Sequence, residues 1–164
     1  MANRIAAVCA AVLIPLAFSV TSVGARAENP NRQSFENGIV KVRSAYPLSE
    51  TVERIQQDIS AKGIMFFFAV EQSKLAGEAG INLRPSTLLV FGNPGLGAQF
   101  LTSNPLAGID WPVRLLVVED ERGDVWTVYN DFGYIARRHG IADREAAFQM
   151  ASEVIASITS GVAR

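Results

Sequence analysis

Cysteine and histidine are almost absent from this sequence. Cys9 and His139 are the only residues of their kinds. A single cysteine cannot form an internal disulfide, and a single histidine excludes a metal site built from several histidine ligands. Cys9 also lies too early in an apolar run to be a lipid-attachment cysteine. We therefore expect no metal site and no cofactor.

Long apolar runs are absent after the first 27 residues, where no stretch exceeds seven residues. The long run at 5–20 follows a positive charge at Arg4, is interrupted by Pro15, and precedes Ala-Arg-Ala at 25–27. These features are typical of a secretory signal peptide, 1–27, cleaved after Ala27. An uncleaved anchor is the alternative, but the run is shorter than the ~20 apolar residues that span a bilayer. We expect export to the periplasm or the extracellular space, without stable membrane insertion after cleavage.

Basic residues are not in excess. Cleavage after Ala27 leaves 137 residues with 13 basic and 16 acidic side chains, a net charge of −3. This balance gives no polycationic surface, so we expect no nucleic-acid partner. The length suits one domain with its own core. We expect a flexible lead-in at 28–37, which is polar and has no periodicity, and one domain at 38–164.

The spacing of apolar residues predicts an α+β fold. Apolar side chains recur at helical spacing from Ser49 to Gly63 and from Asp143 to Gly161. Strands are expected at 38–44, 64–70, 86–92, 113–120 and 125–130, with a short helix after Asp131. The order of main elements is strand, helix, four strands, helix. It predicts a mainly antiparallel sheet of about five strands with the helices packed on one face.

Three of these strands are apolar on both faces. Large apolar residues follow one another at 66–68, 88–91 and 115–118, where a half-exposed strand would alternate. Two helices cover one face of such a sheet, and each large apolar side chain left in water forgoes roughly 1.5–3 kcal/mol. We expect the second face to be covered by long loops at 72–85 and 93–112, by a second copy of the chain, or by an apolar ligand.

A glycine-rich segment, FGNPGLGAQF, follows one of these strands at 91–100. It lacks the lysine and hydroxyl of a P-loop, and Phe100 stands where a dinucleotide-binding loop needs glycine. Amides exposed before a short helix could still bind an anion. We favour a shaped turn, begun by Asn93 and Pro94 and relaxed by the glycines that follow.

Polar groups gather where the last strand meets the next helix. Tyr129, Asn130 and Asp131 bring a phenol, an amide and a carboxylate to that point, where binding groups often lie. The structural alternative is that Asp131 caps the helix and Tyr129 packs with its hydroxyl at the rim. The candidate ligand-binding residues are Asn93, Pro94, Trp126, Tyr129, Asn130 and Asp131.

Residues with catalytic potential lie in separate segments. His139 stands just before Gly140, where a cation suits the negative end of a helix. The acidic residues of 119–124 are typical of a solvated turn and lack the spacing of a calcium loop. No G-x-S-x-G elbow is present. Glu71 and His139 are therefore secondary candidates, and the sequence identifies no catalytic residue.

Several segments together resemble the domain-of-unknown-function family 302. The resemblance rests on Leu83-Arg84-Pro85, FGNP at 91–94, Pro112 before a strand, YND at 129–131 and RHGI at 138–141. It covers about residues 38–141. It implies a small α+β domain, dimeric in some members, with no established activity. Family members often carry an Asp-His pair where this chain has Glu71-Gln72, and a GTPLM-like sequence where this chain has GAQFL.

Three function classes follow. The leading hypothesis is an exported homodimeric binding module that holds a small, partly apolar molecule without turning it over. The second is a structural or interaction module of the cell envelope, whose apolar sheet face docks a copy of itself or an envelope protein. The third is an enzyme of unknown class that uses Glu71, Asp131 or His139 as acid or base. Binding is favoured because it survives the loss of the family's histidine better than catalysis would.

Overall fold

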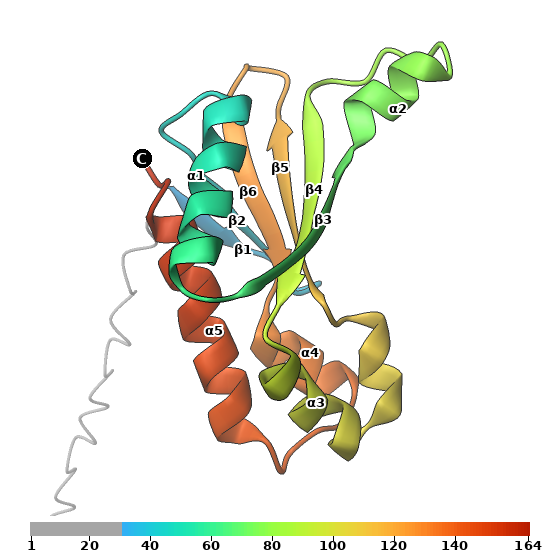
Figure 1. Cartoon of the computed structure of the whole chain (residues 1–164), viewed down its shortest axis with the longest axis vertical. Helices are drawn as coiled ribbons and strands as arrows, with labels where there is room; N and C mark the ends of the chain where they lie inside the picture. The colour runs from blue at the N-terminus through green and yellow to red at the C-terminus, as the bar shows by residue number, and fades with distance from the viewer. Residues whose placement is uncertain (1–30) are drawn as a thin grey trace, which may run out of the picture.

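The chain folds around one antiparallel sheet of six strands (Figure 1). The computed structural model describes residues 31–164, so the expected signal peptide lies outside the described residues. The strand order in space is β1-β2-β6-β5-β4-β3. The predicted α+β fold is confirmed, with one strand more than the expected five. The strands are β1 (Arg32–Ser34), β2 (Ile39–Arg43), β3 (Met65–Glu71), β4 (Ser86–Gly92), β5 (Val113–Glu119) and β6 (Val125–Asn130).

Two long helices, α1 (Leu48–Ala61) and α5 (Glu145–Ser160), lie along the same side of the sheet (Figure 1). Each buries one stripe: Ile55 and Ile59 of α1 and Ile155 and Ile158 of α5 are almost inaccessible to solvent. They pack with the inward-facing residues of the central strands, among them Leu89, Leu115 and Val117. The helical spacing of these isoleucines is the reason the helices were predictable from the sequence.

The shorter helices lie at the two ends of the sheet. Helices α3 (Pro94–Ser103) and α4 (Phe132–Arg138) lie at the end where β4 and β6 finish, and α2 (Gln72–Glu78) projects from the opposite end (Figure 1). The segment after α3 is a 3-10 helix, η1 (Pro105–Ile109). The prediction of long loops at 72–85 and 93–112 was therefore wrong, because half of the first segment and most of the second are helical.

The predicted lead-in also contains structure. Residues Arg32–Ser34 form β1 and pair antiparallel with Val40–Val42 of β2. All three residues of β1 are exposed. A strand held by backbone hydrogen bonds at the sheet edge needs no apolar alternation, and the sequence therefore carried no signal for it.

The face of the sheet away from α1 and α5 carries a continuous apolar row. Val70, Leu88, Leu116 and Val128 lie directly opposite one another across β3, β4, β5 and β6. All four are half-buried, whereas Leu89, Leu115 and Val117, which face α1 and α5, are fully buried. We call these four residues the apolar row.

Strand β3 is an edge strand, although its sequence predicts a middle one. Phe66, Phe67 and Phe68 are all exposed, and the register with β4 shifts between Phe66 and Phe68. A strand that is apolar on both faces normally lies inside a sheet. Here the same pattern leaves three aromatic rings and one free backbone edge facing solvent, which is a recognised site of strand pairing between chains.

Candidate functional site

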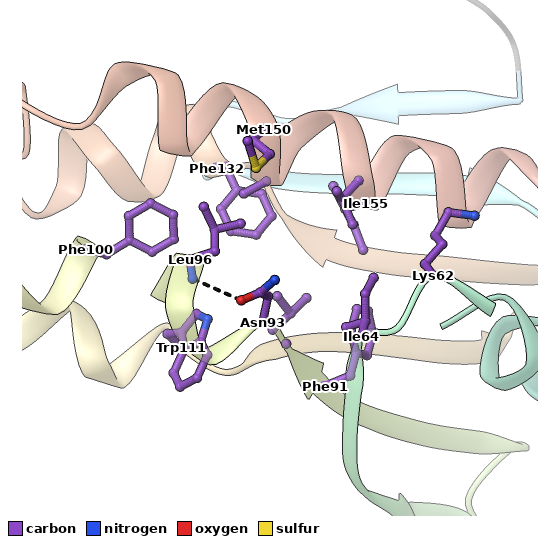
Figure 2. Close-up of a pocket in the computed structure, with 14 residues that line it drawn as sticks. Lys62, Ile64, Phe91, Asn93, Leu96, Phe100, Trp111, Phe132, Met150 and Ile155 are labelled. Atoms are coloured by element: carbon purple, nitrogen blue, oxygen red, sulfur yellow. Dashed lines mark hydrogen bonds between the residues drawn. The ribbon is translucent and has the colours of Figure 1, made fainter. Parts of the chain in front are cut away.

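A cavity of about 160 Å³ opens between the end of β4, the start of α3 and the middle of α5 (Figure 2). Four aromatic rings and several aliphatic side chains form its wall, and three of the rings, those of Phe91, Phe100 and Phe132, are deeply buried. An apolar cavity of about 150 Å³ is large enough to take one benzene ring. The wall includes Ile64, Phe91, Leu96, Phe100, Trp111, Val113, Phe132, Met150, Ala151, Val154 and Ile155.

The turn after β4 sets one side of this cavity. Asn93 is the N-cap of α3: its Oδ1 accepts a hydrogen bond of 3.1 Å from the backbone N–H of Leu96. Pro94 occupies the first turn of the helix, where its missing N–H costs nothing. The segment FGNPGLG is therefore a strand-to-helix junction, in agreement with the turn favoured from the sequence.

Trp111 forms a second side of the cavity, and its ring packs against the backbone of two glycines, Gly92 and Gly97. A Cβ placed on Gly97 would stand 2.1 Å from Cε2 of Trp111, and one on Gly92 would stand 3.2 Å from Cζ2. On another side, Phe67 meets the Trp111 ring edge-on, with centroids 6.2 Å apart and planes at 81°. The indole is therefore held between α3 and the bulge of β3, so the two glycines determine the shape of the cavity.

Among the described residues, Lys62 brings the one charged side chain and Asn93 the one amide side chain to the cavity wall. Lys62 is the C-cap of α1, and its ammonium forms an ion pair with Asp58 one turn earlier. Both polar groups come from the ends of helices, while the apolar wall comes from the core (Figure 2). The site thus combines an apolar interior with a few polar groups, the usual composition of a small-molecule pocket.

A protein-family model described as "Domain of unknown function DUF302" matches residues 40–159. The chain belongs to the DUF302 family. A crystal structure of an uncharacterized conserved DUF302 protein from Bacillus stearothermophilus has the same fold, with a TM-score of 0.69 at 17% identity. The similarity covers 76% of this chain and 98% of that one.

The DUF302 chain is also similar to curated proteins of Brucella. It is 35% identical over 112 residues to the Fluoride-specific ion channel FluC 1 of Brucella suis biovar 1, covering 68% of this chain and 44% of that protein. The identity to FluC 2 of Brucella melitensis biotype 1 is also 35%, covering 42% of that protein. The chain thus spans less than half the length of these relatives. Within residues 31–164, no helix is both long enough and apolar enough to cross a membrane.

The predicted groove of the DUF302 chain is not formed as one site. Asn93 lines the cavity, and Pro94 begins α3 beside it. Asp131 caps α4 by accepting a 2.7 Å hydrogen bond from the N–H of Tyr134, as its structural alternative predicts. Asn130 lies in a separate hollow of about 10 Å³, too small for any ligand. Of the predicted residues, therefore, only Asn93 lines the cavity.

Trp126 and Tyr129 lie on opposite faces of the sheet, because they are an odd number of residues apart in β6. Tyr129 belongs to the core on the helix side, and burial raises the pKa of its phenol. Trp126 lies under Lys41, whose Nζ is 4.3 Å from the ring centroid. The two rings cannot line one groove, and that part of the prediction was wrong.

The Trp126 indole also affects the pKa of a neighbouring carboxyl group, that of Asp120. Its Nε1–H donates a 2.9 Å hydrogen bond to Oδ2 of Asp120, and this bond lowers the pKa of Asp120. A carboxyl group whose pKa is lower in the folded protein than in the unfolded chain stabilises the fold at pH values above its unfolded-state pKa. That stabilisation is lost as the pH falls through the folded-state pKa. We expect Trp126→Phe to raise the pKa of Asp120 towards its ordinary value in an NMR titration.

Asp143 is the internal control for this titration. The pKa of Asp143 is lowered chiefly by a hydrogen bond from Ser103, which Trp126→Phe leaves untouched. An unchanged pKa of Asp120 in the variant, or an equal rise at both carboxyls, would contradict the assigned role of the indole.

The secondary candidates do not meet. Glu71 is the exposed last residue of β3, whereas His139 caps the C-terminal end of α4. His139 is more than the helix-end cation that its sequence position predicts. Its Nε2 lies 2.7 Å from Oδ2 of Asp110, and both side chains are almost wholly buried. Arg114 and Arg138 reach the same carboxyl from the surface, at 3.4 and 3.3 Å.

Asp110 was not identified from the sequence. It lies between η1 and β5, and its only signal is its position just before Trp111-Pro112. The Asp110–His139 pair links that junction to α4, and Asn104 adds a 2.8 Å hydrogen bond to the His139 carbonyl. No group of three or more His, Cys, Asp or Glu residues within 31–164 has the arrangement of a metal site.

Proposed function

We propose that this DUF302 chain is an exported binding module that holds one small, largely apolar molecule in the cavity beside α5. The observation that carries the proposal is the cavity itself, a space of about 160 Å³ walled by four aromatic rings, with Lys62 and Asn93 also in its lining. Protein interiors are normally packed to the density of organic crystals, so an apolar space of this size is unusual unless something fills it.

The residues around the cavity favour binding over turnover. Of the residues within 31–164 that line it, Lys62 alone has an ionisable side chain, and an ion pair already engages its ammonium. Asp131, Glu71 and His139 belong to other parts of the fold. General acid–base catalysis needs a titratable group within hydrogen-bond reach of the reacting atom, and none of these three is placed at the cavity.

Toluene is a suitable probe because one ring fills a space of this size. We expect toluene to raise the thermal unfolding midpoint of the protein, since a ligand at a hundred times its Kd stabilises the folded state by about 2.7 kcal/mol. Calorimetric titration should give one site per chain.

A cavity-filling pair of variants tests the location. Ala151 lines the cavity, whereas Ala146 is exposed on the same helix. We expect Ala151→Leu to abolish toluene binding and Ala146→Leu to leave it unchanged. Wild-type protein that neither binds toluene nor is stabilised by it would overturn the proposal.

A second function, self-association, is supported by β3 and the apolar row. Strand β3 has a free backbone edge and carries three exposed phenylalanines. The apolar row begins on this strand at Val70 and runs across the sheet through Leu88, Leu116 and Val128. Two antiparallel edge strands related by a two-fold axis present the same groups to each other, so this edge is complementary to itself. We propose a homodimer formed by β3 of two copies.

Light scattering coupled to size exclusion measures this state. We expect the wild-type protein to have the mass of a dimer and Phe68→Asp to have the mass of a monomer, because Phe68 is 54% exposed on the proposed interface. Phe35→Asp is the matched control, since Phe35 is 48% exposed beside β1 at the other edge of the sheet. A wild-type protein that stays monomeric at high concentration would contradict the proposed homodimer.

A further inference from the structure

Asn93 brings a hydrogen-bond donor to the cavity that its structural role does not require. As the N-cap of α3 it uses only its side-chain carbonyl oxygen, Oδ1, which accepts from the N–H of Leu96 at 3.1 Å. Serine and aspartate cap helices as well as asparagine does, and neither has an amide nitrogen. The helix cap therefore leaves the Nδ2 group of Asn93 unexplained.

The orientation of this donor follows from the cap. Because Oδ1 faces the N–H of Leu96, the Nδ2 hydrogens point the other way. Figure 2 shows the nitrogen turned away from Leu96 and towards the middle of the pocket, on the side where Ile155 lies. Asn93 is solvent-exposed and also lines the cavity, so its amide lies at an opening of the cavity.

The cavity wall offers this amide no partner. Among the described residues, no other lining side chain carries an oxygen atom, and within 31–164 no acceptor takes up the Nδ2 hydrogens. A hydrocarbon that fills the cavity would displace water from this donor and leave it unpaired, which costs free energy. A ligand with an acceptor oxygen at that position avoids the cost.

The acceptor should be uncharged. The ammonium of Lys62 is already paired with Asp58, and Figure 2 shows it turned away from the middle of the pocket. A carboxylate placed against the Asn93 amide would therefore lose water among apolar side chains without gaining a countercharge, which is strongly unfavourable. The oxygen of a neutral carbonyl group is satisfied by a single donor.

We infer that the ligand is a small neutral carbonyl compound whose oxygen accepts a hydrogen bond from Nδ2 of Asn93. Its apolar body is one ring or a short branched chain, because the interior holds about 160 Å³. This inference rests on the proposed function, as it assigns the chemistry of the molecule that the cavity holds.

Cyclohexanone and methylenecyclohexane form the matched probe pair, since they share a ring and a shape and differ only in the exocyclic oxygen or methylene group. In NMR spectra of the isotope-labelled protein, we expect cyclohexanone to move the side-chain amide resonance of Asn93 downfield, the effect of a new hydrogen bond. Methylenecyclohexane should bind without that shift. Benzoate, the charged probe, should bind more weakly than cyclohexanone.

Two variants of Asn93 keep the helix cap and remove the amide. Asn93→Ser and Asn93→Asp should each weaken cyclohexanone binding about three- to tenfold, the usual effect of one neutral hydrogen bond, and leave methylenecyclohexane binding unchanged. Each probe is compared only with itself, because a ketone and a hydrocarbon differ in hydration. Asn37→Asp is the matched control. Oδ1 of Asn37 also accepts a backbone N–H, that of Ile39, but Asn37 does not line the cavity, so neither affinity should change.

The possible failures are distinct. If both probes bind but the Asn93 variants weaken both equally or neither, the hydrogen bond is not formed and the inference fails, while the binding module stands. The same holds if methylenecyclohexane binds and cyclohexanone does not, or if benzoate binds more tightly than cyclohexanone. If toluene and both matched probes fail to bind, the proposed function fails with it.

Discussion

Replacing Gly97 by alanine is expected to lower the free energy of unfolding by about 1–3 kcal/mol, the usual cost of overpacking a well-packed site. It is also expected to abolish ligand binding in the cavity. The added methyl group would stand 2.1 Å from Trp111, whose ring cannot withdraw freely because Phe67 packs against it from β3. The indole must therefore move, and with it one wall of the cavity. Chemical denaturation and toluene calorimetry measure the two effects.

Gly77→Ala is the control for this substitution. Gly77 lies in α2, where an added Cβ would meet nothing within 4 Å. Alanine is the better helix former, so we expect this variant to be equally stable or slightly more stable than the wild type. If Gly97→Ala behaved in the same way as Gly77→Ala, the tight fit of Trp111 against α3 would be wrong.

Replacing Asp110 by alanine is expected to cost about 2–4 kcal/mol of folding free energy, because it leaves the buried His139 side chain without a hydrogen-bond partner. The His139 side chain is 8% exposed and would lose the acceptor 2.7 Å from its Nε2. The two arginines add less, since both are about half exposed and can be solvated when the carboxylate is gone. Urea denaturation at neutral pH measures the loss.

A double-mutant cycle separates the pair from its surroundings. If the Asp110–His139 contact carries most of the effect, Asp110→Ala combined with His139→Ala should cost clearly less than the two single losses together. Asp143→Ala is the matched control, since Asp143 is exposed and its removal leaves no buried group without a partner. Additive losses at positions 110 and 139 would show that the contact has no energetic role of its own.

The fold was largely predictable because it depends on local periodicity. The apolar stripe of α1 and that of α5 recur at helical spacing, and Gly63 and Gly161 mark their ends. The strands were visible as apolar runs separated by turn residues. Strand β1 was not, because an exposed three-residue edge strand is held by backbone groups that look alike in every sequence.

The order of strands in the sheet was harder to predict. The phenylalanines of β3 indicate a strand buried on both faces, yet β3 lies at the edge. Apolar residues on both faces indicate that a strand is buried, but they do not show whether both of its edges pair with strands of the same chain. If the proposed dimer forms, β3 becomes an interior strand of a larger sheet, as its composition suggests.

The site was predictable only at Asn93. The cavity joins residues from 62 to 155, and contacts between segments so far apart leave no local pattern. One error was avoidable, because Trp126 and Tyr129 are three residues apart in a strand and must face opposite ways. Asp110 could not be singled out, since its partner His139 is 29 residues away along the chain.

A crystal structure of the protein soaked in toluene is the most direct test of the central claim, that the cavity is an apolar binding site. We expect electron density for one ring enclosed by Phe91, Phe100, Phe132 and Ile155, with Lys62 and Asn93 also in the lining. Ordered water filling that space, side chains collapsed into it, or toluene bound only elsewhere would contradict the claim.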